Sequence, residues 1–223
     1  MVRTPLSLRI LPDYTKGEDV ANMVTHIIGG TIGICVTVFA VLISCANGNV
    51  WGVVSGSIFG GSMVLLYAVS SVYHGLKNNF GKKVMQVIDH CTIYLLIAGT
   101  YTPILLSAVR KVNPVVAWTV FGVVWGLSFL GATLAAIDHT CFAKLEIILY
   151  IGIGWCIIFA LKTTIAAMGY KGFMWLLSGG IAYTVGAVAY GIGSKHRYFH
   201  TIFHIFVDIG SVLQAVAVLK YAL

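Results

Sequence analysis

Two histidines, His200 and His204, lie four residues apart at the start of the last long apolar stretch of the chain, Phe199–Leu223. An ionisable side chain inside a membrane span costs roughly 2.5 kcal/mol or more, so such residues usually face the interior of a helix bundle and belong to a site. The i, i+4 spacing places both imidazoles on one helical face, close enough to share a metal ion. Because the chain holds seven histidines, the pair gains weight only from what other segments place beside it.

Two further segments carry matching residues. One apolar stretch ends in Ser70-x3-His74, and Asp89 lies near the start of the next. If these segments meet the pair His200 and His204, three imidazoles from two helices converge with a carboxylate from a third. Three imidazoles with an open fourth position form the pattern of a catalytic zinc site. Asp89 would then accept or orient a proton of the zinc-activated water, and Ser70 would support the site or an oxyanion.

The composition defines the class of protein that must position these residues. Only 9% of residues are charged, 59% are hydrophobic and the mean hydropathy is +0.93, whereas a soluble domain carries about 25% charged residues. The sequence predicts an all-α integral membrane protein, a seven-transmembrane helix bundle with spans of roughly 20 residues each. These spans are 23–45, 50–74, 84–108, 114–137, 145–161, 173–193 and 199–222. Residues 1–21 are expected to form a cytoplasmic N-terminal segment, and residues 22–223 the transmembrane domain. The first apolar run is too long for a signal peptide, which favours a retained span.

The distribution of lysine and arginine predicts the orientation. With the N-terminus inside, nine basic residues face the cytoplasm: Arg3, Arg9, Lys16, Lys77, Lys82, Lys83, Lys144, Lys195 and Arg197. Five face outward: Arg110, Lys111, Lys162, Lys171 and Lys220. The positive-inside rule therefore favours a cytoplasmic N-terminus and a C-terminus outside. The net charge of +7 is attributed to contact with anionic headgroups, and no nucleic-acid partner is expected.

In this orientation the residues capable of chemistry gather at the cytoplasmic side. All seven histidines lie there: His26, His74, His90, His139, His196, His200 and His204. Six of the seven acids lie there too: Asp13, Glu18, Asp19, Asp89, Asp138 and Glu146. Only Asp208 lies deeper. The outer half lacks the ionisable path that a metal or proton transporter needs, which disfavours that function.

Each candidate also has a purely structural interpretation. Ser70 can bond to the carbonyl four residues earlier, and Asp89 can be a charge near a helix N-terminus. A single interfacial histidine can reach toward headgroups, so His26 is either a partner of the site or an interfacial residue.

Other residues are expected to be structural. We expect His90, His139 and His196 to be solvated, and Glu146 to pair with Lys144 or Lys195. The spacings Gly29/Gly33, Gly56/Gly60 and Gly122/Gly126 predict close helix packing. The five cysteines have no C-x-x-C spacing, which disfavours disulfides and a thiolate metal site.

The ordered combination of Ser70-x3-His74, Asp89 and His200-x3-His204 over seven spans resembles the progestin and adipoQ receptor superfamily (PAQR). It resembles more closely that superfamily's bacterial branch, hemolysin III. The supporting strings are Gly17-Glu18-Asp19-Val20-Ala21-Asn22 with Thr25-His26, Ala98-Gly99-Thr100-Tyr101-Thr102-Pro103, and Phe199–Val207. The resemblance covers nearly all of residues 17–222.

The resemblance implies a ligand set. Adiponectin receptors and alkaline ceramidases of the superfamily hold zinc on three histidines, with an aspartate contacting the metal-bound water. On the matching positions, this implies His74, His200 and His204 as zinc ligands, Asp89 as the water partner and Ser70 as the motif serine. It also implies a seven-helix bundle with a cytoplasmic N-terminus. The motif requires no acid at Asp208, about 6 Å beyond His204 along the helix, so the role of Asp208 stays open.

The function expected from the resemblance is zinc-dependent hydrolysis of an amide or ester bond in a lipid-like substrate, with membrane lipids as partners. One alternative is a non-catalytic sensor or regulator of lipid homeostasis with structural zinc. Another is a cytolysin, as the hemolysin label says, although seven retained spans suit an exported toxin poorly. The expected location is the bacterial cell membrane, and the sequence leaves the oligomeric state open.

The orientation can be tested with topology reporters. A reporter fused after Leu223 should register the outer side of the membrane, because the basic residues concentrate on the opposite side. A cytoplasmic signal from that fusion, with a fusion in the loop after Gly75 as the matched control, would reverse the face assigned to the histidines.

Overall fold

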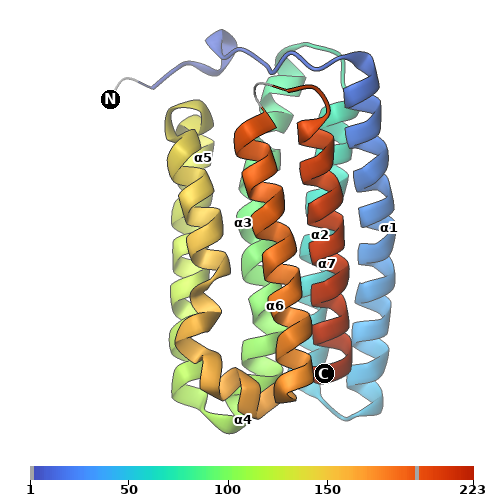
Figure 1. The fold of residues 1–223 in the computed structure, drawn as a ribbon, viewed down its shortest axis with the longest axis vertical. Helices are drawn as coiled ribbons and strands as arrows, with labels where there is room; N and C mark the ends of the chain where they lie inside the picture. Colours follow the sequence, from blue (N-terminus) through green and yellow to red (C-terminus); the bar gives the residue numbers. More distant parts are fainter. Residues whose placement is uncertain (1–2, 194–195) are drawn as a thin grey trace.

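The computed structural model describes residues 3–193 and 196–223, and over these residues the chain forms helices and no strand. The all-α prediction is confirmed. The elements are η1 (Leu6–Leu8), α1 (Lys16–Ala46), α2 (Val50–Gly75), α3 (Phe80–Pro103), η2 (Ile104–Val109), α4 (Arg110–Val112), α5 (Pro114–Gly154), η3 (Cys156–Ala160), α6 (Leu161–Gly193) and α7 (Phe199–Tyr221). The long helices run along one axis of an elongated bundle (Figure 1). Lys195, one of the nine basic residues assigned to the cytoplasm, lies outside the described residues.

Five helical stretches among the described residues are long and apolar enough to cross a membrane. They are Lys16–Ala46, Val50–Gly75, Phe80–Val112, Pro114–Ile192 and Phe199–Tyr221. The stretch Pro114–Ile192 holds 79 residues, far more than the roughly 20 that one crossing requires. This is a multi-pass membrane protein.

Within that long stretch, α5 and α6 each contain one residue with non-helical backbone angles. Asp138 in α5 has an extended backbone (φ −163°, ψ 87°), and its carboxylate accepts hydrogen bonds from the Thr140 hydroxyl at 2.6 Å and the Cys141 N–H at 3.3 Å. An aspartate in this conformation caps the helix that follows it. Gly169 in α6 has φ 69°, which glycine adopts without a steric penalty. The ribbon reverses direction at the upper end of α5 and turns back upward near the lower end of α6 (Figure 1).

Two of the three glycine pairs allow helices to approach closely, as predicted. A Cβ on Gly60 of α2 would collide with Thr37 of α1, and one on Gly33 would press against the backbone of α2. The prediction is wrong for Gly122 and Gly126, because nothing lies within 4 Å of a Cβ at either position. Both glycines are on the outward face of α5, and spacing alone does not say whether a small-residue face meets another helix.

The arrangement gathers the candidate residues at one end of the bundle. The N-terminal segment and the start of α7 share that end, and the C-terminus lies at the opposite one (Figure 1). The helix α3, which carries Asp89, is the most buried of the five spanning stretches. Asp89, near the start of α3, is partly buried.

Candidate metal centre

The end of α2 and the start of α7 bring His74, His200 and His204 together. One ligand nitrogen from each histidine lies within 4.8 Å of the other two. The Nε2 atoms of His200 and His204 are 3.0 Å apart. The predicted convergence of three imidazoles is thus confirmed, and the metal itself stays a prediction.

The ring of His74 is oriented by an acid on α1. Its Nδ1 lies 3.0 Å from Oδ1 of Asp19, and Nζ of Lys82 donates to the other carboxylate oxygen at 2.8 Å. A ring that donates Nδ1–H to a carboxylate presents Nε2 as a lone pair. Nε2 of His74 is buried and has no hydrogen-bond partner among the described residues, so this nitrogen is available for a metal ion.

His204 is oriented in the same way by α1. Its Nδ1 lies 3.2 Å from the carbonyl oxygen of Asn22, which leaves Nε2 to face His200. The ring of His26 stacks on the ring of His204, with centroids 3.6 Å apart and an interplanar angle of 5°. His26 is only 3% exposed. It is a partner of the site and not an interfacial residue.

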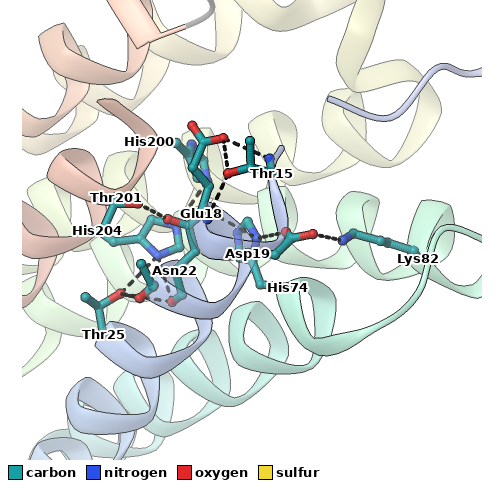
Figure 2. Close-up of polar contacts among 11 residues, drawn as sticks. Thr15, Glu18, Asp19, Asn22, Thr25, His74, Lys82, His200, Thr201 and His204 are labelled. Carbon is teal, nitrogen blue, oxygen red and sulfur yellow. Dashed lines mark hydrogen bonds and ion pairs between the residues drawn. The ribbon is translucent and has the colours of Figure 1, made fainter. Parts of the chain in front are cut away.

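The first turns of α1 hold these contacts in place. Thr15 and Glu18 form a capping box that starts the helix, an arrangement that satisfies two free N–H groups at once. Glu18 also accepts the backbone N–H of Tyr198 at 2.8 Å, directly before α7. One turn further, the side-chain oxygen of Asn22 accepts from the Thr201 hydroxyl at 2.6 Å. Figure 2 shows these α1 side chains beside His74 of α2 and the two histidines of α7.

The donor set fits a transition-metal ion. In a tetrahedral site with Zn–N bonds of about 2.0–2.1 Å, neighbouring ligand nitrogens are about 3.4 Å apart. The Nε2 separation of 3.0 Å is close to this value. Two ring nitrogens at that distance need a proton or a cation between them, and imidazole suits zinc, copper, iron and nickel. His74 and His204, whose Nδ1 atoms are held by α1, have their metal-binding nitrogens fixed in direction.

An apolar cavity begins at His26 and His204 and extends into the bundle. The centre of a water-sized sphere can move through about 130 Å³ of it. Its polar end is lined by His26, Ser70, Asp89 and His204, and most of its remaining wall is apolar. It reaches Gln214, ten residues along α7 from His204 and so about 15 Å deeper.

The two candidate catalytic residues lie at the polar end of this cavity. Asp89 of α3 and Ser70 of α2 both line it. Ser70 Oγ is buried and has no hydrogen-bond partner among the described residues, so the structural interpretation of Ser70, a bond to the preceding turn, is not adopted. Asp208 also holds a buried oxygen without such a partner. It lies against Gly29, where a Cβ would collide with the carboxylate.

The prediction that His90 and His139 are solvated is wrong. Nδ1 of His90 lies 2.9 Å from Oε2 of Glu146, and the His90 and His139 rings stack with centroids 4.6 Å apart. His139 is only 5% exposed. Glu146 therefore pairs with His90 and not with Lys144, and the other predicted partner, Lys195, lies outside the described residues. The break at Asp138 returns the second part of α5 toward α3, so residues expected in a loop become buried.

The residues that orient the histidines were not recognised from the sequence. Asp19 and Asn22 belong to the string Gly17-Glu18-Asp19-Val20-Ala21-Asn22, which supports the family resemblance. The resemblance predicts no separate role for either residue. A usable signal was present, because Glu18, Asn22 and Thr25 lie at i, i+4 and i+7 on the face of an otherwise apolar helix.

This helical, multi-pass membrane protein thus carries a three-histidine cluster at one end of its bundle. The chain belongs to the haemolysin-III-related family, whose model matches residues 14–215. It is 37% identical to the Hemolysin-3 homolog of Bacillus subtilis (strain 168), over 93% of this chain and 96% of that protein. It is 36% identical to Hemolysin-3 of Bacillus cereus, over 92% of each chain.

A more distant similarity extends to the wider superfamily. The human monocyte to macrophage differentiation factor, a PAQR relative, is 24% identical over 98% of this chain and 90% of that protein. The full-length matches establish the family and a bacterial type of multi-pass membrane protein.

The histidine cluster yields a direct prediction on metal content. His200→Ala should abolish zinc binding by purified protein, because two imidazoles hold the ion far less tightly than three. His196→Ala is the matched control, since this histidine is exposed and outside the cluster. Elemental analysis at equal protein concentration measures the outcome. Equal zinc in both variants would contradict a metal role for His200.

Asp19 provides a second prediction on the same site. Asp19→Asn should lower zinc affinity by about 10- to 100-fold, the usual effect of removing a partner that orients a ligand histidine. Lys171→Gln is the control, because Lys171 is an exposed residue of α6 outside the histidine cluster. Competition with a chromogenic chelator gives both affinities, and matching values would show that Asp19 does not tune His74.

Proposed function

We propose that this protein is a zinc-dependent membrane hydrolase that cleaves an amide or ester bond in a lipid-like substrate. The observation that carries the proposal is that His204, one of the three clustered histidines, also lines a long apolar cavity. One proposed metal ligand (His204), a carboxylate (Asp89) and a hydroxyl (Ser70) line the polar end of a space whose walls suit an acyl chain.

We also propose seven crossings with a cytoplasmic N-terminus. The helical breaks at Asp138 and Gly169 divide the stretch Pro114–Ile192 into parts of suitable length for three crossings. Together with the other four stretches this makes seven. The excess of basic residues at the histidine end supports a cytoplasmic position for that end.

Zinc held by His74, His200 and His204 would lower the pKa of a coordinated water toward about 7. The residues of the chain supply the rest. Asp89, as a carboxylate within the same cavity, is placed to accept a proton and later deliver it to the leaving group. The Ser70 hydroxyl, which lines the same cavity as Asp89, would donate a hydrogen bond to the oxygen of the scissile carbonyl.

The cavity wall determines what kind of substrate suits the site. A lipid can leave its chain among apolar side chains while its polar head reaches Asp89 and Ser70. The wall also limits water around the head, which strengthens each electrostatic contact there. A small hydrophilic amide would gain nothing from a wall of this kind, so the shape favours a long-chain substrate.

The names of the Bacillus relatives suggest lysis of other cells. In this chain the polar chemistry lies inside the bundle and the outer surface is rich in exposed Ile, Val, Leu and Phe, as expected of a protein that stays in its own membrane. We therefore place the hydrolase first and retain a zinc-containing lipid sensor as the outcome that the next experiment can reveal.

The substitution Asp89→Asn distinguishes a hydrolase from a lipid sensor. The substitution preserves shape but removes the base, so zinc should be retained while hydrolysis falls on the order of 10²-fold or more. The measurement pairs zinc content with the lipid profile of expressing cells and with turnover of a panel of N-acyl and ester lipids in vesicles.

Lys171→Gln, at an exposed position of α6, serves as the control for Asp89→Asn and should match the wild type in both readouts. A sensor predicts instead that wild type and Asp89→Asn give the same lipid profile and no turnover, while both hold zinc. That result would count against catalysis.

A further inference from the structure

The residues before α1 remain on the bundle instead of extending away from it. Figure 1 shows this N-terminal segment, residues 3–15, running across the end of the bundle where α7 begins. It contains the short turn η1 (Leu6–Leu8) and leads into the capping box at Thr15. A segment with charged residues and prolines but little regular secondary structure adopts a single conformation only when specific contacts hold it.

A buried arginine anchors the far part of the segment. Arg9 is 3% exposed, and its Nη2 donates to the carbonyl of Ile137 at 2.6 Å. Its Nε lies 3.7 Å from Oδ1 of Asp138, and the N–H of Thr4 donates to the other oxygen of that carboxylate at 2.8 Å. A buried charge is stable only when it is paired and hydrogen-bonded, so these contacts hold the segment to the break in α5.

Two further contacts hold the rest of the segment. Nζ of Lys83 on α3 donates to the carbonyl of Ser7 at 2.6 Å. Nη1 of Arg197, before α7, donates to the carbonyl of Asp13 at 2.6 Å. Three separate parts of the bundle, α3, α5 and the start of α7, therefore bind the backbone of one short stretch.

These attachments place Tyr14 against the histidine cluster. Its ring stacks on the ring of His200, with centroids 5.0 Å apart and an interplanar angle of 28°. It also contacts His74, at a centroid distance of 5.5 Å. Burial and the neighbouring hydroxyls of Tyr73 and Tyr190 raise the pKa of the Tyr14 phenol, so the ring is uncharged at neutral pH.

We propose that the N-terminal segment is a cover for the three-histidine site and that Tyr14 is its closing residue, which must move before a metal ion or hydrophilic solute can pass between the site and the aqueous phase. The inference rests on the proposed metal site for its main test. Tyr14 acts here as a positioning residue: it touches two ligand histidines and controls their exposure without taking part in bond breaking.

The test measures how fast zinc leaves. Purified protein is loaded with zinc, its zinc content is recorded, and the rate of loss to excess water-soluble chelator is followed. Tyr14→Ala should release zinc on the order of tenfold faster, because two aromatic contacts are removed. Tyr14→Phe keeps the ring and should match the wild type. Tyr170→Ala is the matched control, since Tyr170 is 67% exposed and lies in α6 beside Gly169.

A second variant tests the anchor. Arg9→Gln removes the charge paired with Asp138 and should also speed zinc release, without touching any histidine. Circular dichroism and thermal unfolding identify variants that lose the fold. Release rates for folded Tyr14→Ala and Arg9→Gln equal to the wild-type rate would overturn the cover.

A metal-free measurement keeps the two proposals separable. In protein stripped of metal, exchange of the His200 ring C2 proton with D₂O, followed by mass spectrometry, reports how exposed this imidazole is. Exchange should be faster in Tyr14→Ala than in wild type or Tyr14→Phe. If no variant ever binds zinc but this difference holds, the cover stands and the proposed function fails. If the protein binds zinc but Tyr14→Ala and wild type have equal rates of proton exchange and of zinc release, only the proposed cover is overturned. If no variant binds zinc and the proton exchange rates are equal, both proposals are overturned.

Discussion

The junction between the first turns of α1 and the start of α7 is the constraint on which the histidine site depends. Glu18 closes the capping box of α1 and, with the same carboxylate, accepts the N–H of Tyr198. This fixes the register of two helices that are nearly the whole chain apart in sequence. Asn22, one turn later, then reaches Thr201 and His204 together. A shift of one residue in either helix would move each of these atoms by about 1.5 Å along the axis and rotate it away.

That junction also explains how several imidazoles can share a buried space. Charged histidines packed ring against ring would repel one another in a medium with little water. The contacts from Asp19 to His74 and from Asn22 to His204 are made on Nδ1, so the remaining nitrogens converge as lone pairs. The site thus selects the tautomer that a metal ion requires.

Several polar atoms at the site have no partner within the described protein. Both ring nitrogens of His26, the Ser70 hydroxyl and Nε2 of His74 are among them. Each such buried group costs about 1–3 kcal/mol when it is left unpaired. These unpaired polar atoms lower stability and lie close to the proposed metal ligands. Such a cluster is typical of a binding site and not of a core that stabilises the fold.

The sequence by itself determined the class of protein and the inventory of the site. Few charges and long apolar runs indicate a chain that lies in the membrane. Because backbone N–H and C=O groups there must bond to each other, apolar runs of this length form helices. The pairs Ser70-x3-His74 and His200-x3-His204 define single helical faces, because the helical period is local. Only the tertiary structure decided which faces meet. It made His26 a stacking partner, buried His139 and Glu146 behind the break at Asp138, and laid Tyr14 across the cluster. A helical period specifies the direction of a side chain but not its neighbour, and contacts of 3 Å between distant segments depend on caps, breaks and packing that no local pattern encodes.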